Sequence, residues 1–424
     1  MDGTSQPTLS ADAPRRERTF RQLASIICWI LVIAWGVWWT ANLVQGRMLF
    51  AERTWIKLPA FGVDFLGHVD KPTRVWLDHG DPYEDQTRRF SYPPIVTRLF
   101  AWVKATDPQT SLRIWIGLAA ICAVIGVVAS LRARETLGLE PLPLSGGIAA
   151  VLFSTPVLFA LERANYDLLI VPCIVAAAYL LRKRDATADA AAAFFLAIAA
   201  WAKVYPGLLI FALLAVSRFR AAVWMGVWGL LIGASDIPEL MRFIANTRAD
   251  VEATQALARV VRDIHPWNHP LGIVWRDLWA GTPLAYVPGH IGSAITVGAL
   301  FVWVSFHMRK SKVEELLLPY LYWTVALASF IPPISNDYNI TPLPLSIIAL
   351  WSRREPWYVQ AALAALLLWW QPVALPLPGR AVMFIKLIGL IAVAMMLVRQ
   401  SRIFAGAHAR SFPNDQRVAG LVPG

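Results

Sequence analysis

Long apolar stretches set the limits on what this chain can fold into. Runs of about 20 apolar residues, the length an α-helix needs to cross the hydrocarbon core of a bilayer, recur along the whole chain, beginning with Leu23–Thr40. Hydrophobic residues make up 57% of the 424 residues and charged residues only 16%, against roughly 25% charged residues in soluble domains. The sequence therefore predicts an all-α, polytopic membrane protein and excludes a soluble multidomain one.

Basic residues gather at the ends of these apolar runs. The clusters are Arg15/Arg16/Arg18/Arg21, Arg132/Arg134, Arg182/Lys183/Arg184, Arg218/Arg220, Arg309/Lys310/Lys312, Arg353/Arg354 and Arg399/Arg402. Positive charge concentrates on the cytoplasmic side of membrane proteins, so the net charge of +11 needs no nucleic acid to explain it. Between successive clusters the apolar sequence is long enough for an outward and a returning helix. This alternation predicts about twelve transmembrane helices, with both termini in the cytoplasm.

The spans form one predicted domain. We expect a single transmembrane domain over residues 21–402, preceded by a disordered cytoplasmic tail at 1–20 and followed by a cytoplasmic tail at 403–424. Two long segments, residues 44–89 and 236–288, fall on the outer side. The first contains Gly62–Asp78, for which we predict short interfacial helices.

The unusual polar residues all fall on this predicted outer side. Five short motifs carry them: Val63–Phe65, Tyr92–Pro94, Glu162–Asp167, Lys203–Pro206 and Ser335–Asn339. Ionisable residues within or beside spans are costly and usually mark function. Their shared side predicts a single site at the outer membrane surface.

Each motif also has a purely structural interpretation. Asp64 fits a solvated carboxylate at the interface, and the prolines after Tyr92 fit the start of a helix. Arg163 and Asp167 have the spacing of an i,i+4 ion pair. Lys203 fits a side chain that reaches from a helix end toward the interface. The sequence leaves both interpretations open at each position.

A metal site has little support. His265 and His269 are spaced as zinc ligands on a helix can be. Pro266 and Pro270 disfavour a regular helix there, and no third ligand is evident. We therefore expect neither a metal nor another cofactor.

The order of these motifs resembles glycosyltransferase family 87, the polyprenyl-phosphate-mannose-dependent α-mannosyltransferases of the GT-C superclass. The resemblance covers most of the chain. It runs through Asp64-Phe65, Gly80-Asp81-Pro82-Tyr83, Phe90-Ser91-Tyr92-Pro93-Pro94, Asn165, Lys203-Val204-Tyr205-Pro206 and Ser335–Asn339. One departure concerns Ser335–Asn339, which stands where family members commonly carry a turn rich in Trp and His. Tyr338 takes the place of the histidine that assists the donor phosphate.

The resemblance implies a GT-C type fold and a glycosyltransferase of the cell membrane, with its site on the extracytoplasmic side. The implied donor is a polyprenyl-phosphate-linked hexose, mannose in the family, and the implied acceptor is a hydroxyl of a lipid or glycan. In an inverting displacement, Asp64 is the candidate general base, and Arg163 and Lys203 are candidates for binding the phosphate. The candidate hydrogen-bond partners are Tyr92, Asn165, Tyr205, Asn336 and Tyr338. The remaining candidates are Asp167 and Asp337, as cation-orienting groups or alternative bases, and His265 and His269, as sources of the missing imidazole.

Two other functions stay open. A transporter or flippase of a polyprenyl-linked lipid also places charges inside the membrane, but transporters often show repeated halves, which this sequence does not. A glycan ligase or polymerase normally has a large outer loop rich in arginine. Residues 236–288 do contain such arginines, namely Arg242, Arg248, Arg259, Arg262 and Arg276.

Overall fold

The computed structural model describes most of the chain beyond residue 60. The described parts are residues 61–84, 90, 92–260, 289–311, 314–332, 337–352, 355–368 and 379–411, with scattered positions in 19–45 and 271–282. Every regular element in these parts is a helix. The predicted all-α class is therefore confirmed for the described residues.

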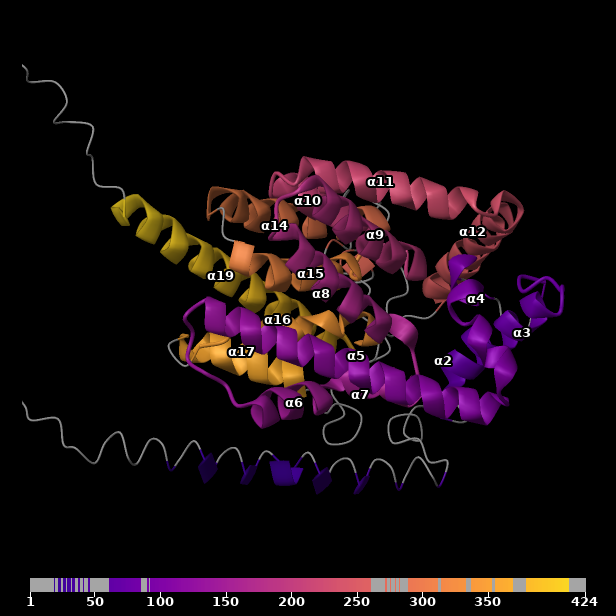
Figure 1. The fold of residues 1–424 in the computed structure, drawn as a ribbon, viewed down its shortest axis with the longest axis horizontal. Coiled ribbons are helices and arrows are strands. Elements are labelled where there is room, and N and C mark those ends of the chain that lie inside the picture. The colour runs from indigo at the N-terminus through magenta and orange to yellow at the C-terminus, as the bar shows by residue number, and fades with distance from the viewer. Residues whose placement is uncertain are drawn as a thin grey trace, which may run out of the picture.

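The predicted short helices of the first long loop are present. They are α2 (Val63–Phe65), the π-helical turn η1 (Leu66–Asp70) and α3 (Lys71–Leu77). Pro72 lies in the first turn of α3, where a missing backbone N–H costs no hydrogen bond. Two further short elements, α4 (Ile95–Leu99) and η2 (Ala101–Ala105), complete this part of the molecule. These elements gather with the start of α12 (Ile237–Val260) at the right of Figure 1.

A long apolar helix begins directly after them. Helix α5 (Pro108–Thr136) has Asp107 as its N-cap, whose side chain accepts hydrogen bonds from the backbone N–H groups of Gln109 and Thr110. Helices α6 (Leu144–Leu152) and α7 (Thr155–Arg163) follow, and the chain bends by 65° between them.

The centre of the bundle is built from short apolar helices. They are η3 (Tyr166–Leu169), α8 (Ile170–Leu181), α9 (Ala186–Ala202), η4 (Tyr205–Leu208), α10 (Leu209–Ala215), α15 (Leu317–Ala328) and α16 (Pro342–Leu350). Every residue of α15 and α16 is buried. A helix that is apolar on all sides belongs inside the protein, and these two form the middle of the core.

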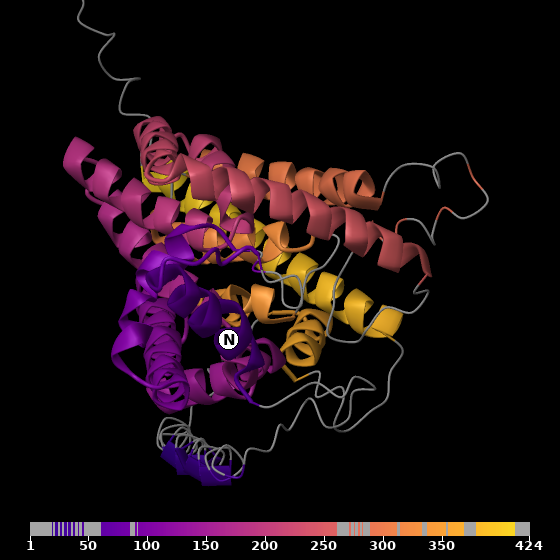
Figure 2. The ribbon, with the colours of Figure 1, turned by 90° about the vertical axis from the view of Figure 1, so that its right-hand side faces the viewer.

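The remaining helices surround this centre. They are α11 (Phe219–Ala234), α14 (Gly289–Ser311), α17 (Trp357–Leu368) and α19 (Gly379–Ser411), with the short turns η6 (Glu314–Leu316) and η7 (Asp337–Ile340). Helix α19 continues through Ser411, beyond the predicted domain boundary at residue 402. Figure 2 views the bundle from the end that carries α2, α3 and α4.

Three helices of the described chain are long and apolar enough to cross a membrane. They contain residues Pro108–Thr136, Ile291–Arg309 and Met383–Gly406. Two bent pairs, α6 with α7 and α11 with α12, raise the number to five if each pair is one span. The apolar helices indicate a membrane protein, and the total of about twelve spans stays a prediction.

Candidate functional site

Asp64 is buried, although it lies on a short helix at the end of the bundle. Only 4% of its surface is exposed. Both oxygens of its carboxylate are engaged by Arg163: Nε donates to Oδ2 at 2.9 Å and Nη2 donates to Oδ1 at 2.5 Å. A solvated interfacial carboxylate, the structural alternative for Asp64, is therefore wrong.

Arg163 reaches Asp64 because α7 ends at this residue. Ala164 has a positive φ of 51°, the left-handed conformation that often closes a helix. The helix ends there, and Asp167 lies in the separate turn η3 and does not continue the face that carries Arg163. The i,i+4 ion pair between Arg163 and Asp167, an alternative from the sequence, is wrong for this reason.

Asn165 connects the carboxylate of Asp64 to the backbone of Asp167. Its side-chain Nδ2 donates to Oδ2 of Asp64 at 2.9 Å. Its Oδ1 accepts from the backbone N–H of Asp167 at 3.1 Å and so caps η3. Asn165 is completely buried, so one amide links Asp64 to the first turn of the next helix.

Asp167 forms the second half of the site. Tyr205 donates its phenolic hydrogen to Oδ1 at 2.7 Å, and Asn339 donates to Oδ2 at 3.2 Å. The Lys203 ammonium lies 3.4 Å from the same Oδ2. Tyr205 also approaches the backbone oxygen of Asn339 at 3.4 Å. Three segments that are far apart in the sequence thus meet at one carboxylate.

Lys203 is enclosed by aromatic rings and does not reach toward solvent. Its Nζ lies 4.6 Å from the ring centroid of Tyr92 and 4.6 Å from that of Tyr166. It also lies 3.5 Å from the Tyr92 hydroxyl. The side chain is 9% exposed. The alternative of a lysine that reaches to the interface is therefore wrong, and the ammonium is stabilised by two rings and a carboxylate.

Both partners of the Asp64–Arg163 pair are anchored on α5. Gly62 has a φ of +75°, and a Cβ built there would lie 2.4 Å from Leu112 Cδ1, so only glycine lets α2 approach α5 this closely. Trp115 stacks on Phe65 with ring centroids 6.0 Å apart. Its Nε1 donates to the backbone oxygen of Ala164 at 2.9 Å.

The charge on Asp64 is set by two opposing effects. Burial alone raises the pKa of this carboxyl because it removes water from the charged form. The charge and hydrogen bonds of Arg163, with the hydrogen bond from Asn165, outweigh burial and hold the pKa of Asp64 below its ordinary value. Burial raises the pKa of Tyr92 well above its ordinary value, and the nearby Asp64 charge adds to this shift. Asp64 is therefore ionised at neutral pH, and Tyr92 carries its proton.

The predicted site residues fall into three groups. The structure brings together Asp64, Tyr92, Arg163, Asn165, Asp167, Lys203 and Tyr205. Only the backbone of Asp337 and Tyr338, in η7, is described. The other three candidates, His265, His269 and Asn336, lie outside the described residues.

Two residues of the cluster are not among the predicted candidates. Tyr166 packs against Lys203. The ring of Tyr166 also contacts the ring of Tyr92 edge to face, with centroids 4.8 Å apart. Asn339 contacts Asp167. Both lie within predicted polar motifs, and a position inside such a motif was the only signal that could have found them.

Nothing in the described residues has the composition of a metal site. No three His, Cys, Asp and Glu side chains gather there as ligands would. The buried carboxylates of Asp64 and Asp167 each have a cation of the protein beside them.

The fold and site define a membrane-embedded protein with a buried, charged cluster at one end of a helical bundle. The model of glycosyltransferase family 87 matches residues 90–333, more than half of the chain. The protein belongs to this family and is a transferase enzyme that uses a sugar donor and an acceptor. No match is found among curated proteins. The matched range includes Arg163, Asn165 and Lys203, and Asp64 lies before it.

Proposed function

We propose that the protein transfers a hexose, mannose by the resemblance to its family, from a polyprenyl-phosphate donor to a hydroxyl of a lipid or glycan. The reaction inverts the anomeric carbon, and the site faces the extracytoplasmic side of the cell membrane. The buried Asp64 carboxylate, held between Arg163 and Asn165, is the observation that carries this proposal. A transferase needs a positioned base for the acceptor and cations for the leaving phosphate, and this cluster offers both.

The reaction exchanges one bond at the anomeric carbon for another. The acceptor oxygen forms its bond to this carbon while Asp64 takes the hydroxyl proton. The bond from the anomeric carbon to the phosphate oxygen breaks, and polyprenyl phosphate leaves with the electron pair. Arg163 and Lys203 stabilise the negative charge that appears on the phosphate.

The contact with Arg163 links the pKa of Asp64 to donor binding. A carboxylate with a low pKa is a weak base, and a general base works best with a pKa near the operating pH. Phosphate oxygens match the guanidinium fork as well as a carboxylate does. When the donor phosphate takes Arg163, Asp64 loses the cation that lowers its pKa, and burial then raises the pKa. Donor binding thereby prepares the base.

Asp167 has a supporting role in this proposal. It holds Lys203, Tyr205 and Asn339 in place around the site. Lys203 is then a point charge for the donor phosphate, held beside Tyr92 and Tyr166. The mechanism uses no metal, because the two side-chain cations supply the positive charge.

The topology is part of the same proposal. A total of about twelve spans requires that shorter apolar helices, such as Tyr166–Leu181, Ala186–Ala202 and Tyr205–Ala215, each count as one span. The basic ends of these helices then lie in the cytoplasm. The family match favours a glycosyltransferase over a transporter or a glycan ligase.

An assay with purified protein tests the proposal. The protein is incubated with a radiolabelled polyprenyl-phosphate hexose and membrane lipids, and transfer is measured against the Asp64→Asn variant. Transfer that depends on Asp64 supports it. Transfer from nucleotide sugars alone, or movement of intact donor lipid without transfer, overturns it.

A further inference from the structure

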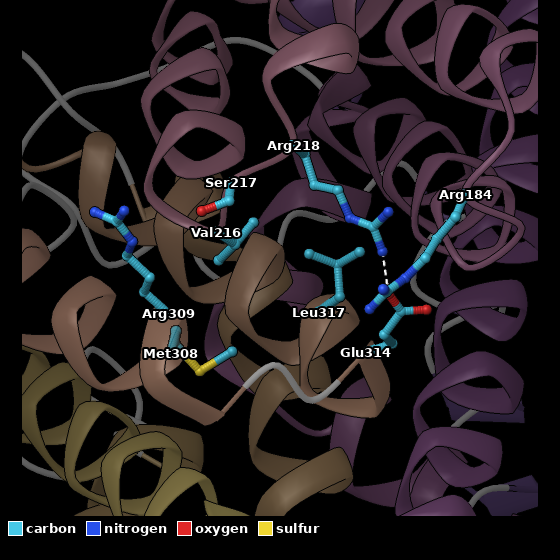
Figure 3. A pocket seen from close by; sticks show the side chains of 8 residues that line it. All are labelled: Arg184, Val216, Ser217, Arg218, Met308, Arg309, Glu314 and Leu317. Atoms are coloured by element: carbon cyan, nitrogen blue, oxygen red, sulfur yellow. Dashed lines mark hydrogen bonds and ion pairs between the residues drawn. The ribbon is translucent and has the colours of Figure 1, made fainter.

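A polar cavity lies at the opposite end of the central helices from the candidate site. Its volume is about 400 Å³. It is lined by Arg184, Val216, Ser217, Arg218, Met308, Arg309, Glu314 and Leu317 (Figure 3). Lys203 follows the C-terminal end of α9, whereas Arg184 precedes its N-terminal end. The 17 residues of α9 span roughly 25 Å at 1.5 Å per residue. With α9 as a span of the proposed topology, the cavity and the candidate site lie near opposite faces of the bilayer.

Positive charge exceeds negative charge around this cavity. Arg184 Nε and Arg218 Nη2 both contact the same oxygen of Glu314, the former at 2.6 Å. Arg309 lies on the other side of the cavity in Figure 3 and is exposed. No carboxylate in the described part of the chain pairs with Arg309. Three guanidinium groups therefore face one carboxylate, which leaves an excess of two positive charges.

The backbone holds two of these arginines at helix ends. Arg184 has a φ of 57°, and Ser217, just before Arg218, has a φ of 62°. These left-handed residues end the preceding turns and return the chain into α9 and α11. Arg218 is the N-cap residue of α11 and its side chain is 15% exposed. Arg184 and Arg218 are thus presented from turns between apolar helices.

Apart from Ser217, the rest of the wall is apolar. The helices around the cavity also expose apolar side chains on their outer faces. Val216, Met308 and Leu317 line the cavity itself. Phe219 and Val223 on α11 are 58% and 66% exposed, and Val302 on α14 is 65% exposed. Such side chains face lipid tails in a membrane protein, which places hydrocarbon beside a basic cavity.

We propose that this cavity binds the phosphate headgroup of an anionic membrane lipid, with the acyl chains along α11 and α14. Guanidinium groups contact phosphate oxygens through paired hydrogen bonds. Basic pockets between transmembrane helices on the cytoplasmic side commonly hold such headgroups. A lipid fits better than free phosphate because half of the wall is apolar and the cavity is much larger than one phosphate group.

Native mass spectrometry of the full-length protein tests the proposal. The protein in detergent is titrated with phosphatidylglycerol, with zwitterionic phosphatidylcholine, and with inorganic phosphate. We expect one phosphatidylglycerol to be retained at concentrations where phosphatidylcholine is lost. Binding that is equal for the two lipids overturns the proposal, and so does inorganic phosphate that displaces phosphatidylglycerol at an equal concentration.

The double variant Arg184→Gln/Arg309→Gln removes the excess charge and leaves the Arg218–Glu314 pair intact, so the fold keeps its internal contact. We expect it to bind phosphatidylglycerol about 30-fold more weakly, the effect of two arginines near anionic lipid. The control is Arg132→Gln, because Arg132 is exposed near the end of α5 and does not line the cavity. Unchanged binding in the double variant, or equal loss in the control, refutes the site.

Glu314→Gln should change phosphatidylglycerol binding in the opposite direction. It raises the excess charge by one, so we expect it to retain phosphatidylglycerol more tightly than the wild type. If Glu314 instead organised a site for a cationic ligand, this variant would bind the anionic lipid no better, and the proposal would fail.

Discussion

Asn165 donates its side-chain N–H to the Asp64 carboxylate across 2.9 Å, although the two residues are separated by 101 positions in the chain. The same amide caps the helix that begins with Tyr166. Asn165 therefore makes one contact with the proposed base and a separate contact that caps the helical turn η3. Substitutions that remove one contact and keep the other can distinguish catalysis from stability.

Asn165→Ser and Asn165→Ala form such a pair. Serine keeps an oxygen that can cap η3 but is too short to reach Asp64. We expect Asn165→Ser to unfold near the wild-type temperature while its transfer rate falls. Asn165→Ala loses the cap as well and should be destabilised by about 1 kcal/mol further. Thermal unfolding and transfer assays on both proteins check this, and equal rates in Asn165→Ser and wild type would show that the Asp64 contact is dispensable.

Asp64→Asn removes the basicity of the proposed base and keeps its size. We expect the transfer rate to fall roughly 10²–10⁴-fold, the usual contribution of a general base, while donor KM changes little. Asp167→Asn is the matched control because Asp167 is a second buried carboxylate of the same cluster. A fully active Asp64→Asn beside an inactive Asp167→Asn would transfer the role of base to Asp167.

Arg163→Gln changes the pH dependence of the enzyme. In the wild type the pKa of Asp64 is depressed, so the carboxylate is ionised above its ordinary pKa near 4. The stability that the pair contributes is present above that pH and is lost as the pH falls through the lower pKa of the folded state. Without Arg163, burial dominates and the pKa of Asp64 rises.

We therefore expect kcat/KM for the donor, which reports the free enzyme, to decline with falling pH at a higher pH in Arg163→Gln than in the wild type. A pH–rate profile of both proteins measures this. Parallel profiles would mean that Arg163 does not control the ionisation of Asp64.

Lys203 and Asp167 can be separated by a double-mutant cycle. Lys203→Met leaves a completely buried carboxylate without its cation, which typically costs about 3–5 kcal/mol. Lys203→Met/Asp167→Asn removes both charges and should recover part of that stability. If Lys203 binds the donor phosphate, the double variant folds but stays inactive. Recovery of activity together with stability would give Lys203 a structural role only.

The two ends of α5 test the topology. Arg113 and Arg132 are both exposed, and 19 residues of helix separate them by roughly 28 Å, close to the thickness of a bilayer core. We expect an impermeant thiol reagent to label Arg113→Cys but not Arg132→Cys in intact cells, with the unsubstituted chain as background. The reverse pattern would place the candidate site in the cytoplasm.

The sequence predicted the helical class and the convergence of the polar motifs because both depend on strong, simple forces. Apolar length identifies membrane helices, and ionisable groups such as Asp64 and Lys203 are too costly to bury separately. The pairing within the cluster depends on details that composition does not carry. Arg163 meets Asp64 and not Asp167 because Ala164 adopts a left-handed conformation, for which alanine has no preference. The composition of Ser335–Asn339 likewise does not indicate which of its polar residues contacts Asp167, so Asn339 was not among the predicted candidates.

Trp115 contacts the neighbours of both members of the Asp64–Arg163 pair. Its ring stacks on Phe65, and its Nε1 donates a hydrogen bond to the backbone oxygen of Ala164. Phe65 follows Asp64 and Ala164 follows Arg163, so the two members of the ion pair share one rigid support in α5. A substitution at Trp115 would therefore disturb both charges at once, although this side chain touches neither of them.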